Sequence, residues 1–411
     1  MARSLSWKIP PSVRLTLLVV FLLLISSQCA ECAQTLRSSG WDSGDILRRF
    51  KLMSPGSGWV TTGPPEYGGV STHLYWTDDG GRNWRQLIPQ DIPVGRLWQI
   101  FFVDRLHGWV LTTEALEPQE NAPFYLLSTE DGGKHWRKLQ LERSSFDLFD
   151  KGNIRYFPSQ MFFSDSKHGW ILWHWQLPLF WRDTLLGTSD GGRTWMRLDD
   201  PAGSGPLQFV SAQDGWIAGV AEYPESFGAP EDTLLWRTHD GGWNWKPVTI
   251  SVPKNSAEEG FYVVAVRFRN MRDGMVAAGL QRDGVTYGFV NCYTGDGGKT
   301  WRFSQFNALG ATPSISNEHI FWSVDRRETK GTLQMEGEAI SFTLPAGLSQ
   351  GGKFLDLDFL DDSNAWVEYR DGSRFLLLST TDRGKTSRLI FPPQHVTGGP
   401  SSDPPKTTPP K

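Results

Sequence analysis

The chain has 411 residues, and its 41 basic and 45 acidic side chains give a formal net charge of −4. It carries no basic tail or stripe, which argues against nucleic acid as a partner. The 20 tryptophans and 43 glycines recur in repeated phrases, so the organisation of the chain has to be derived from these repeats first.

Residues 1–33 have the pattern of a secretory signal peptide. Three basic residues precede an apolar or hydroxylic stretch, residues 15–27. This stretch is shorter than the roughly 20 apolar residues of a membrane-spanning helix, and small residues follow it. We expect cleavage after Cys29 or Cys32 and export to the periplasm or the extracellular space. A lipoprotein is the alternative, because Cys29 follows the apolar stretch. Cleavage after Cys32 leaves Cys292 alone in the mature chain, so no intramolecular disulfide framework is expected.

An eight-residue phrase, which we call the box, recurs six times in the region 34–391. Its template is Thr-x-Asp-Gly-Gly-x-Thr/Asn/His-Trp, and the last copy, from Thr380 to Ser387, departs most from it. A phrase that returns at such regular spacing indicates an array of one supersecondary unit. The box aspartates are Asp79, Asp131, Asp190, Asp240, Asp296 and Asp382.

A second pattern, which we call the frame, precedes each box. It consists of an apolar residue, then Asp, Ser or Asn two places on, then a Gly-Trp pair or its variant. The second unit shows it as Phe102, Asp104 and Gly108-Trp109. Frame and box together define one unit of the repeat.

The gap between the fifth and sixth boxes, from Asp296 to Asp382, is too long for one unit. Within it the frame recurs around Ile315 and Trp322. We therefore predict seven units, of which one, within about 304–344, has lost its box.

Each unit has the composition of four short strands. In the second unit the apolar, β-branched and aromatic runs are Trp98–Val103, Trp109–Thr112, Phe124–Ser128 and His135–Leu139. The Gly-Gly of the box is a tight turn that joins antiparallel strands. The sequence thus predicts an all-β fold, a seven-bladed β-propeller of four-stranded antiparallel blades with one degenerate blade.

The box is best explained as a structural turn. Its Asp can accept backbone N–H groups of the same turn, its glycines adopt conformations that a side chain would forbid, and its Trp can wedge between blades. A metal site needs several converging ligands, whereas each box Asp stands alone in its repeat. No metal and no cofactor are therefore expected.

Frame and box together resemble the Asp-box, or BNR, repeat of sialidases, sortilin-type receptors, xyloglucanases and photosystem II assembly factors. The pairing is most similar to the photosystem II assembly/stability factor type, and it covers roughly Leu47 to Phe391. The resemblance implies a seven-bladed propeller of the sialidase-like superfamily. The matching motifs are structural, and the same fold hosts unrelated activities.

Strand alternation places the box turns on one face and the long, irregular segments on the other. Variable loops on a rigid framework are where binding usually occurs. The expected loop segments are Gly63–Ser71, Thr113–Pro123, Glu142–Pro158, His174–Asp183, Ala221–Asp232 and Pro253–Gly260.

Four neighbouring residues of the third unit are the candidate binding site: Trp173, His174, Trp175 and Trp181. If they are exposed, they form an aromatic surface that could anchor a partner. The alternative is that Trp173 and Trp175 share one face of a strand and pack against the next blade.

The sequence favours an exported, non-catalytic propeller that binds a protein or glycan through the face opposite the box turns. We expect a monomer without a membrane span in the mature chain, and a disordered proline-rich tail at 392–411. The alternative is a sialidase-like or other glycoside hydrolase acting on extracellular glycans. The Phe/Tyr-Arg-Ile-Pro segment of sialidases is absent, and Ile154–Pro158 has its ingredients in another order. We therefore assign no catalytic residue.

Overall fold

The computed structural model describes residues 44–89, 91–117, 122–141, 155–176, 181–198, 200–219, 234–251, 260–282, 285–303, 307–308, 311–315, 321–325, 332–335, 338–392 and 396–397. The predicted signal peptide and most of the predicted tail lie outside these ranges. Among the described residues no helix is long and apolar enough to cross a membrane.

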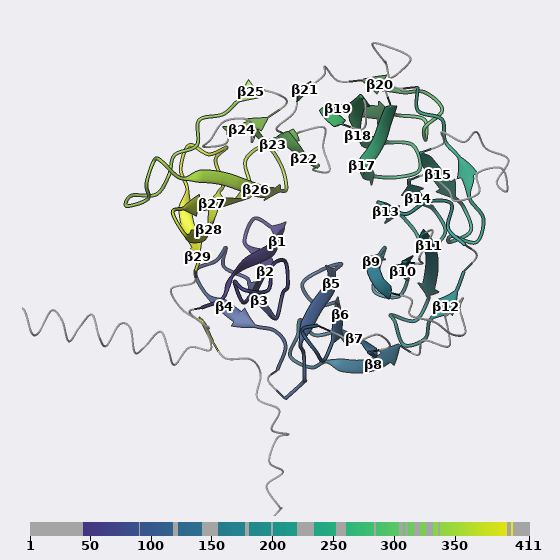
Figure 1. The fold of residues 1–411 in the computed structure, drawn as a ribbon, viewed down its shortest axis with the longest axis horizontal. Helices are drawn as coiled ribbons and strands as arrows, with labels where there is room; N and C mark the ends of the chain where they lie inside the picture. Colours follow the sequence, from purple (N-terminus) through teal and green to yellow (C-terminus); the bar gives the residue numbers. More distant parts are fainter. Residues whose placement is uncertain are drawn as a thin grey trace, which may run out of the picture.

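The described strands form sheets arranged in a ring around a central axis, with the innermost strand of each sheet facing that axis (Figure 1). The first three sheets are β1 (Ile46–Ser54), β2 (Ser57–Gly63), β3 (His73–Thr77) and β4 (Trp84–Gln86); β5 (Arg96–Phe102), β6 (Gly108–Thr113), β7 (Phe124–Thr129) and β8 (Arg137–Leu141); and β9 (Arg155–Phe163), β10 (Gly169–Gln176), β11 (Trp181–Thr188) and β12 (Met196–Arg197).

The remaining sheets continue around the ring. They are β13 (Leu207–Phe209), β14 (Gly215–Ala218), β15 (Leu235–Thr238) and β16 (Lys246–Pro247); β17 (Gly260–Phe268), β18 (Gly274–Arg282), β19 (Val285–Thr294), β20 (Arg302–Phe303) and β21 (Asn307–Ala308); β22 (Ala311–Ile315), β23 (Phe321–Asp325), β24 (Thr332–Met335) and β25 (Glu338–Ala339); and β26 (Lys353–Phe359), β27 (Ala365–Asp371), β28 (Arg374–Thr380) and β29 (Arg388–Phe391).

The β-propeller prediction holds, but the prediction of seven blades, one of them degenerate, is wrong. Six sheets match the predicted unit, with a frame turn after the first strand and a box turn after the third. The small sheet β22–β25 differs from them, because Met335 of β24 pairs with Glu338 of β25 where the others carry a box turn. It packs against β26 of the next blade. The molecule therefore has six box blades, with this additional sheet between the fifth and the sixth.

Two of the six blades also exceed four strands. In one, β21 pairs with β19. In the other, β30 (Val396–Thr397) pairs in parallel with Trp84 and Arg85 of β4. Residues 396–397 lie within the tail, 392–411, for which disorder was predicted.

The frame explains how successive blades interlock. The ring of Trp109 stacks on Phe163 of the next blade, with centroids 3.6 Å apart. Trp170 stacks in the same way on Phe209, at 3.5 Å. Because the frame Phe lies against the frame Gly of its own blade, a Cβ at Gly169 would come within 2.3 Å of the Phe163 ring. The frame glycine therefore makes room for the stacked pair.

The box tryptophans contact the preceding blade. The indole N–H of Trp136 donates to the carbonyl of Leu87 at 2.8 Å. That of Trp84 donates to Ile390 at 2.8 Å and so joins the first blade to the last. Aromatic side chains of this size bury on the order of 150–250 Å² each, so these contacts account for much of the packing between blades.

Candidate functional site

The box carboxylates are engaged within their own turns. In Asp190, Oδ1 accepts hydrogen bonds from the N–H groups of Arg193 (2.8 Å) and Thr194 (2.9 Å), and from the Thr188 hydroxyl (2.8 Å). Its Oδ2 accepts the Thr194 hydroxyl at 2.6 Å. Burial raises the pKa of Asp190, but these hydrogen bonds outweigh it and lower the pKa to about 2. The carboxylate is thus held ionised by its turn.

The other box aspartates also accept hydrogen bonds from their own turns. Asp79, for example, accepts the N–H groups of Arg82 and Asn83 at 3.0 and 2.9 Å. Among the residues that the structure describes, no group of three or more His, Cys, Asp or Glu side chains could hold a metal ion. The structure therefore gives these aspartates a role in turn geometry.

The predicted aromatic surface of the third unit is wrong for two of its members. Trp173 and Trp175 are fully buried. Trp173 packs edge-on against Phe124 of the preceding blade, at 4.8 Å between centroids. The Trp175 indole donates to the Thr184 hydroxyl at 3.0 Å. Both rings are buried on one strand face, as the alternative interpretation has it, but Trp173 contacts the preceding blade and not the next one.

The cause is the length of the strands that carry them. The segment His174–Asp183 was expected to be a loop, but β10 continues to Gln176 and β11 begins at Trp181. His174 then pairs in register with Asp183, and its Nδ1 lies 2.8 Å from the carboxylate. Both side chains are largely buried. The side chain of Trp181 lies outside the described residues.

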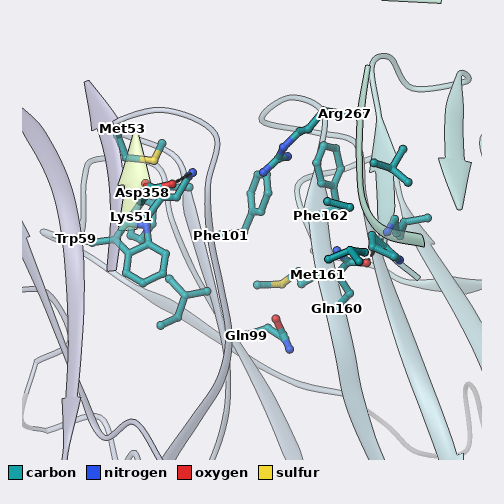
Figure 2. A pocket seen from close by; sticks show the side chains of 17 residues that line it. Lys51, Met53, Trp59, Gln99, Phe101, Gln160, Met161, Phe162, Arg267 and Asp358 are labelled. Carbon is teal, nitrogen blue, oxygen red and sulfur yellow. Dashed lines mark hydrogen bonds and ion pairs between the residues drawn. The ribbon is translucent and has the colours of Figure 1, made fainter. Parts of the chain in front are cut away.

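A cavity of about 580 Å³, which sequence reasoning missed, lies at the centre of the ring. It is lined by the innermost strands of the six box blades, and Figure 2 shows its side chains. Its charged residues are Lys51, Arg267 and Asp358, and much of the remaining wall is apolar. Each of the three directly precedes the apolar residue of a frame. Since neighbours on a strand point to opposite faces, this position could have been identified in the sequence.

Most polar side chains of the cavity bind the innermost strand of another blade. The Asp358 carboxylate accepts Lys51 Nζ at 2.7 Å and the N–H of Leu52 at 2.6 Å. Gln160 accepts the N–H of Leu207 at 2.6 Å, and Gln99 donates to the carbonyl of Ser159 at 3.0 Å. These bonds satisfy backbone groups on the otherwise open inner edges of the blades.

Arg267 differs from these residues. It lines the cavity, its side chain is accessible to solvent, and it makes no hydrogen bond within the described part of the chain. The surrounding protein displaces bulk water and lowers the pKa of the guanidinium, an effect that the charge of Asp358 opposes. Arg267 is thus the cation of the cavity that is not used to join blades.

The face opposite the box turns is uneven around the ring. Its connections from second to third strands are long in the early blades, as from Gly63 to His73 and from Thr113 to Phe124. In the last blade the corresponding connection is tight, from Asp371 to Arg374. These connections are long in sequence in the first, second and fourth blades. We call the part of this face that these blades form the loop-bearing face.

Arg48 and Lys138 hold described loops of this face through their side chains. Arg48 donates to the carbonyls of Pro64 and Tyr67, the latter at 2.9 Å. Glu114 pairs with Lys138 at 2.6 Å. The loop segments 221–232 and 253–259 lie outside the described residues.

Comparisons with known proteins identify related folds at low sequence identity. A structure of YCF48 bound to D1 peptide is 18% identical, covers 74% of this chain and 84% of that one, and has a TM-score of 0.43. The xyloglucanase of Xanthomonas campestris is 13% identical over 84% of this chain, with a TM-score of 0.42. Prolyl oligopeptidase B of Galerina marginata is 12% identical over 91% of this chain, with a TM-score of 0.50.

This chain spans 45% of the xyloglucanase and 54% of the oligopeptidase, about half of each. At these identities the similarity extends to the fold alone. No protein-family model matches the chain, and no curated relative matches it.

Proposed function

We propose that the protein is an exported, non-catalytic binding module that holds a protein or glycan partner on its loop-bearing face. The observation that carries the proposal is the uneven distribution of loops. Closing the ring needs no more than a tight turn between second and third strands, as Asp371–Arg374 demonstrates. The connections of the first, second and fourth blades are longer in sequence than that requirement, and those of the first and second belong to neighbouring blades of a rigid framework.

The central cavity supports a non-catalytic function. Glycoside hydrolysis usually requires two carboxylates, one on each side of the scissile bond. Among the described residues that line the cavity, Asp358 is the one carboxylate, and it already accepts hydrogen bonds from Lys51 and Leu52. Its charge contributes to joining the first and last blades.

The test is to shorten the loops without disturbing the blades. In one variant, residues 114–123 are replaced by the Asp-Gly-Ser-Arg turn found between β27 and β28, and in a second, residues 220–233 are replaced in the same way. The mature protein and both variants are used as affinity bait, and the captured partners are identified by mass spectrometry.

We expect the shortened variants to keep the thermal unfolding midpoint and lose the partner that the parent captures. The face that carries the box turns, which we call the box face, supplies the control. Trp243→Ser is expected to retain the partner, because Trp243 is an exposed residue of a box turn. Retention of the partner by both loop variants, with loss in the control, would contradict the proposal. Hydrolysis of a glycan by the parent protein would favour the enzymatic alternative.

A further inference from the structure

We propose that the central cavity is a second binding site, which takes a monocarboxylate joined to an apolar group and holds its charge on Arg267. The site lies apart from the loop-bearing face. Arg267 is the penultimate residue of β17, and the turn that follows β17 lies on the box face. The proposal therefore does not rest on the proposed function.

The charges of the cavity favour one negative charge. Lys51 and Arg267 are opposed by the single carboxylate of Asp358, which leaves one positive charge in excess among the described lining residues. Lys51 is paired with Asp358 at 2.7 Å. Arg267 has no hydrogen-bond partner within the described part of the chain, so its guanidinium can receive a carboxylate in bidentate geometry.

The walls of the cavity favour an apolar group beside the carboxylate. Phe101, Phe162, Met53 and Met161 line it, and Figure 2 shows the two phenylalanines and Met53 around the same space as Arg267. A pocket of about 580 Å³ whose walls are more apolar than polar has the size of small-ligand sites.

The same walls disfavour a sugar or another hydroxyl-rich ligand. The amide groups of Gln99 and Gln160 are already bonded to backbone atoms of neighbouring blades. A polyol would lose hydrogen bonds to water in the cavity without gaining replacements, which carries a free-energy cost.

The chemistry fits both a free carboxylic acid and the C-terminus of a peptide that ends in an apolar residue. Titration calorimetry on the mature protein distinguishes them with two matched pairs of probes. The first pair is 3-phenylpropanoate and 3-phenylpropanamide. The second is N-acetylphenylalanine and its amide. Within each pair the two probes differ by the negative charge.

We expect at least one carboxylate to bind saturably, with an affinity at least tenfold above that of its amide and falling as salt is added. Binding of 3-phenylpropanoate alone identifies a free acid as the ligand, and binding of N-acetylphenylalanine alone identifies a peptide terminus. Failure of both carboxylates to bind, or equal binding of acid and amide, overturns the proposal. This comparison needs no variant.

Arg267→Gln adds the residue-level test. It is expected to lower the affinity for the bound carboxylate at least tenfold, and Arg267→Lys to lower it less. The control Arg272→Gln removes the same charge from an exposed turn residue of the same blade and is expected to change affinity less than twofold. Unchanged affinity in a folded Arg267→Gln protein overturns the proposal. The loop-shortened variants described above are expected to bind the carboxylate normally, so the two sites can fail independently.

Discussion

The box aspartates act on folding through the turn that surrounds them. Asp190 accepts hydrogen bonds from three neighbouring residues, Thr188, Arg193 and Thr194. We expect Asp190→Ala to destabilise the protein by about 1–3 kcal/mol, because the partly buried Thr188 hydroxyl and the N–H groups of the turn lose their acceptor. Chemical denaturation measures this change. An unchanged midpoint would contradict the structural role, and Asp91→Ala, at an exposed position, is the control.

The lowered pKa of the Asp190 carboxylate predicts that the stability of the protein depends on pH. This pKa is about 2 in the folded protein, against an ordinary value of 3.8 for an aspartate. A lowered pKa stabilises the folded state fully above the unfolded value, and this stabilisation is lost as pH falls through the folded value. The stability difference between the parent and Asp190→Ala should therefore shrink between about pH 4 and pH 2. A difference that grows on acidification would contradict this account.

Arg383 occupies the first glycine position of the last box in a left-handed conformation, with φ of 62°. That conformation costs a non-glycine residue roughly 1–2 kcal/mol of strain. Glycine adopts it without this strain but loses somewhat more backbone entropy on folding. Arg383→Gly should therefore stabilise the protein by up to about 1 kcal/mol. Lys385→Gly, in the same turn but without a positive φ, should destabilise it. Thermal unfolding of the two variants checks the opposite signs.

At the scale of the elements, the frame couples strand geometry to blade packing. A side chain at Gly169 would collide with Phe163, whose ring supports the stack on Trp109. Gly169→Ala should destabilise the protein by on the order of 1–3 kcal/mol through overpacking. Gly68→Ala, where a Cβ meets open space, should have a smaller effect. Equal unfolding midpoints for the two variants would be inconsistent with this role.

The sequence predicted individual strands well where both ends carry turn residues. In the second unit Phe124–Ser128 was predicted and Phe124–Thr129 is found. Prediction failed at the ends of β10 and β11, because His174 and Asp183 are polar residues that a loop would also carry. Their mutual pairing, which allows both strands to continue, depends on a contact that local composition does not show.

The site was less predictable than the strands. Burial of Trp173 and Trp175 depends on how closely a second blade approaches, so the rings could belong either to a surface or to a core. The cavity residues Lys51, Arg267 and Asp358 come from three distant parts of the chain. Their shared position, directly before the apolar residue of a frame, is visible in the sequence, but their meeting follows from closure of the ring.

At the scale of the whole molecule, repeat spacing located the units but could not establish that all seven form blades. The frame copy near Trp322 lies in a small sheet whose last two strands pair directly at Met335 and Glu338. Without a box, this unit has no Trp at that position to wedge into the preceding blade. The spacing of the frame residues is the same in this unit as in the others, but its packing differs because the box Trp is missing.

Side chains of the inner strands hold particular pairs of blades together. Asp358 joins the last blade to Leu52 of the first, and Gln208 accepts the N–H of Phe268 at 2.6 Å and donates to its carbonyl at 2.9 Å. Asp358→Ala should destabilise the protein by about 1–3 kcal/mol. Amide hydrogen exchange should then accelerate at Leu52 and not at Phe268, and Gln208→Ala should give the reverse pattern. Equal acceleration at both amides would show that the contacts are not local.

The most direct test of the proposed function is site-specific photo-crosslinking of the mature protein to its partner. A photoreactive residue replaces Glu66 or Glu117, exposed on the loop-bearing face, or Arg105 or Lys134, exposed on the box face. The account predicts crosslinks to the partner from the first pair and none from the second. Crosslinks confined to Arg105 and Lys134 would contradict it.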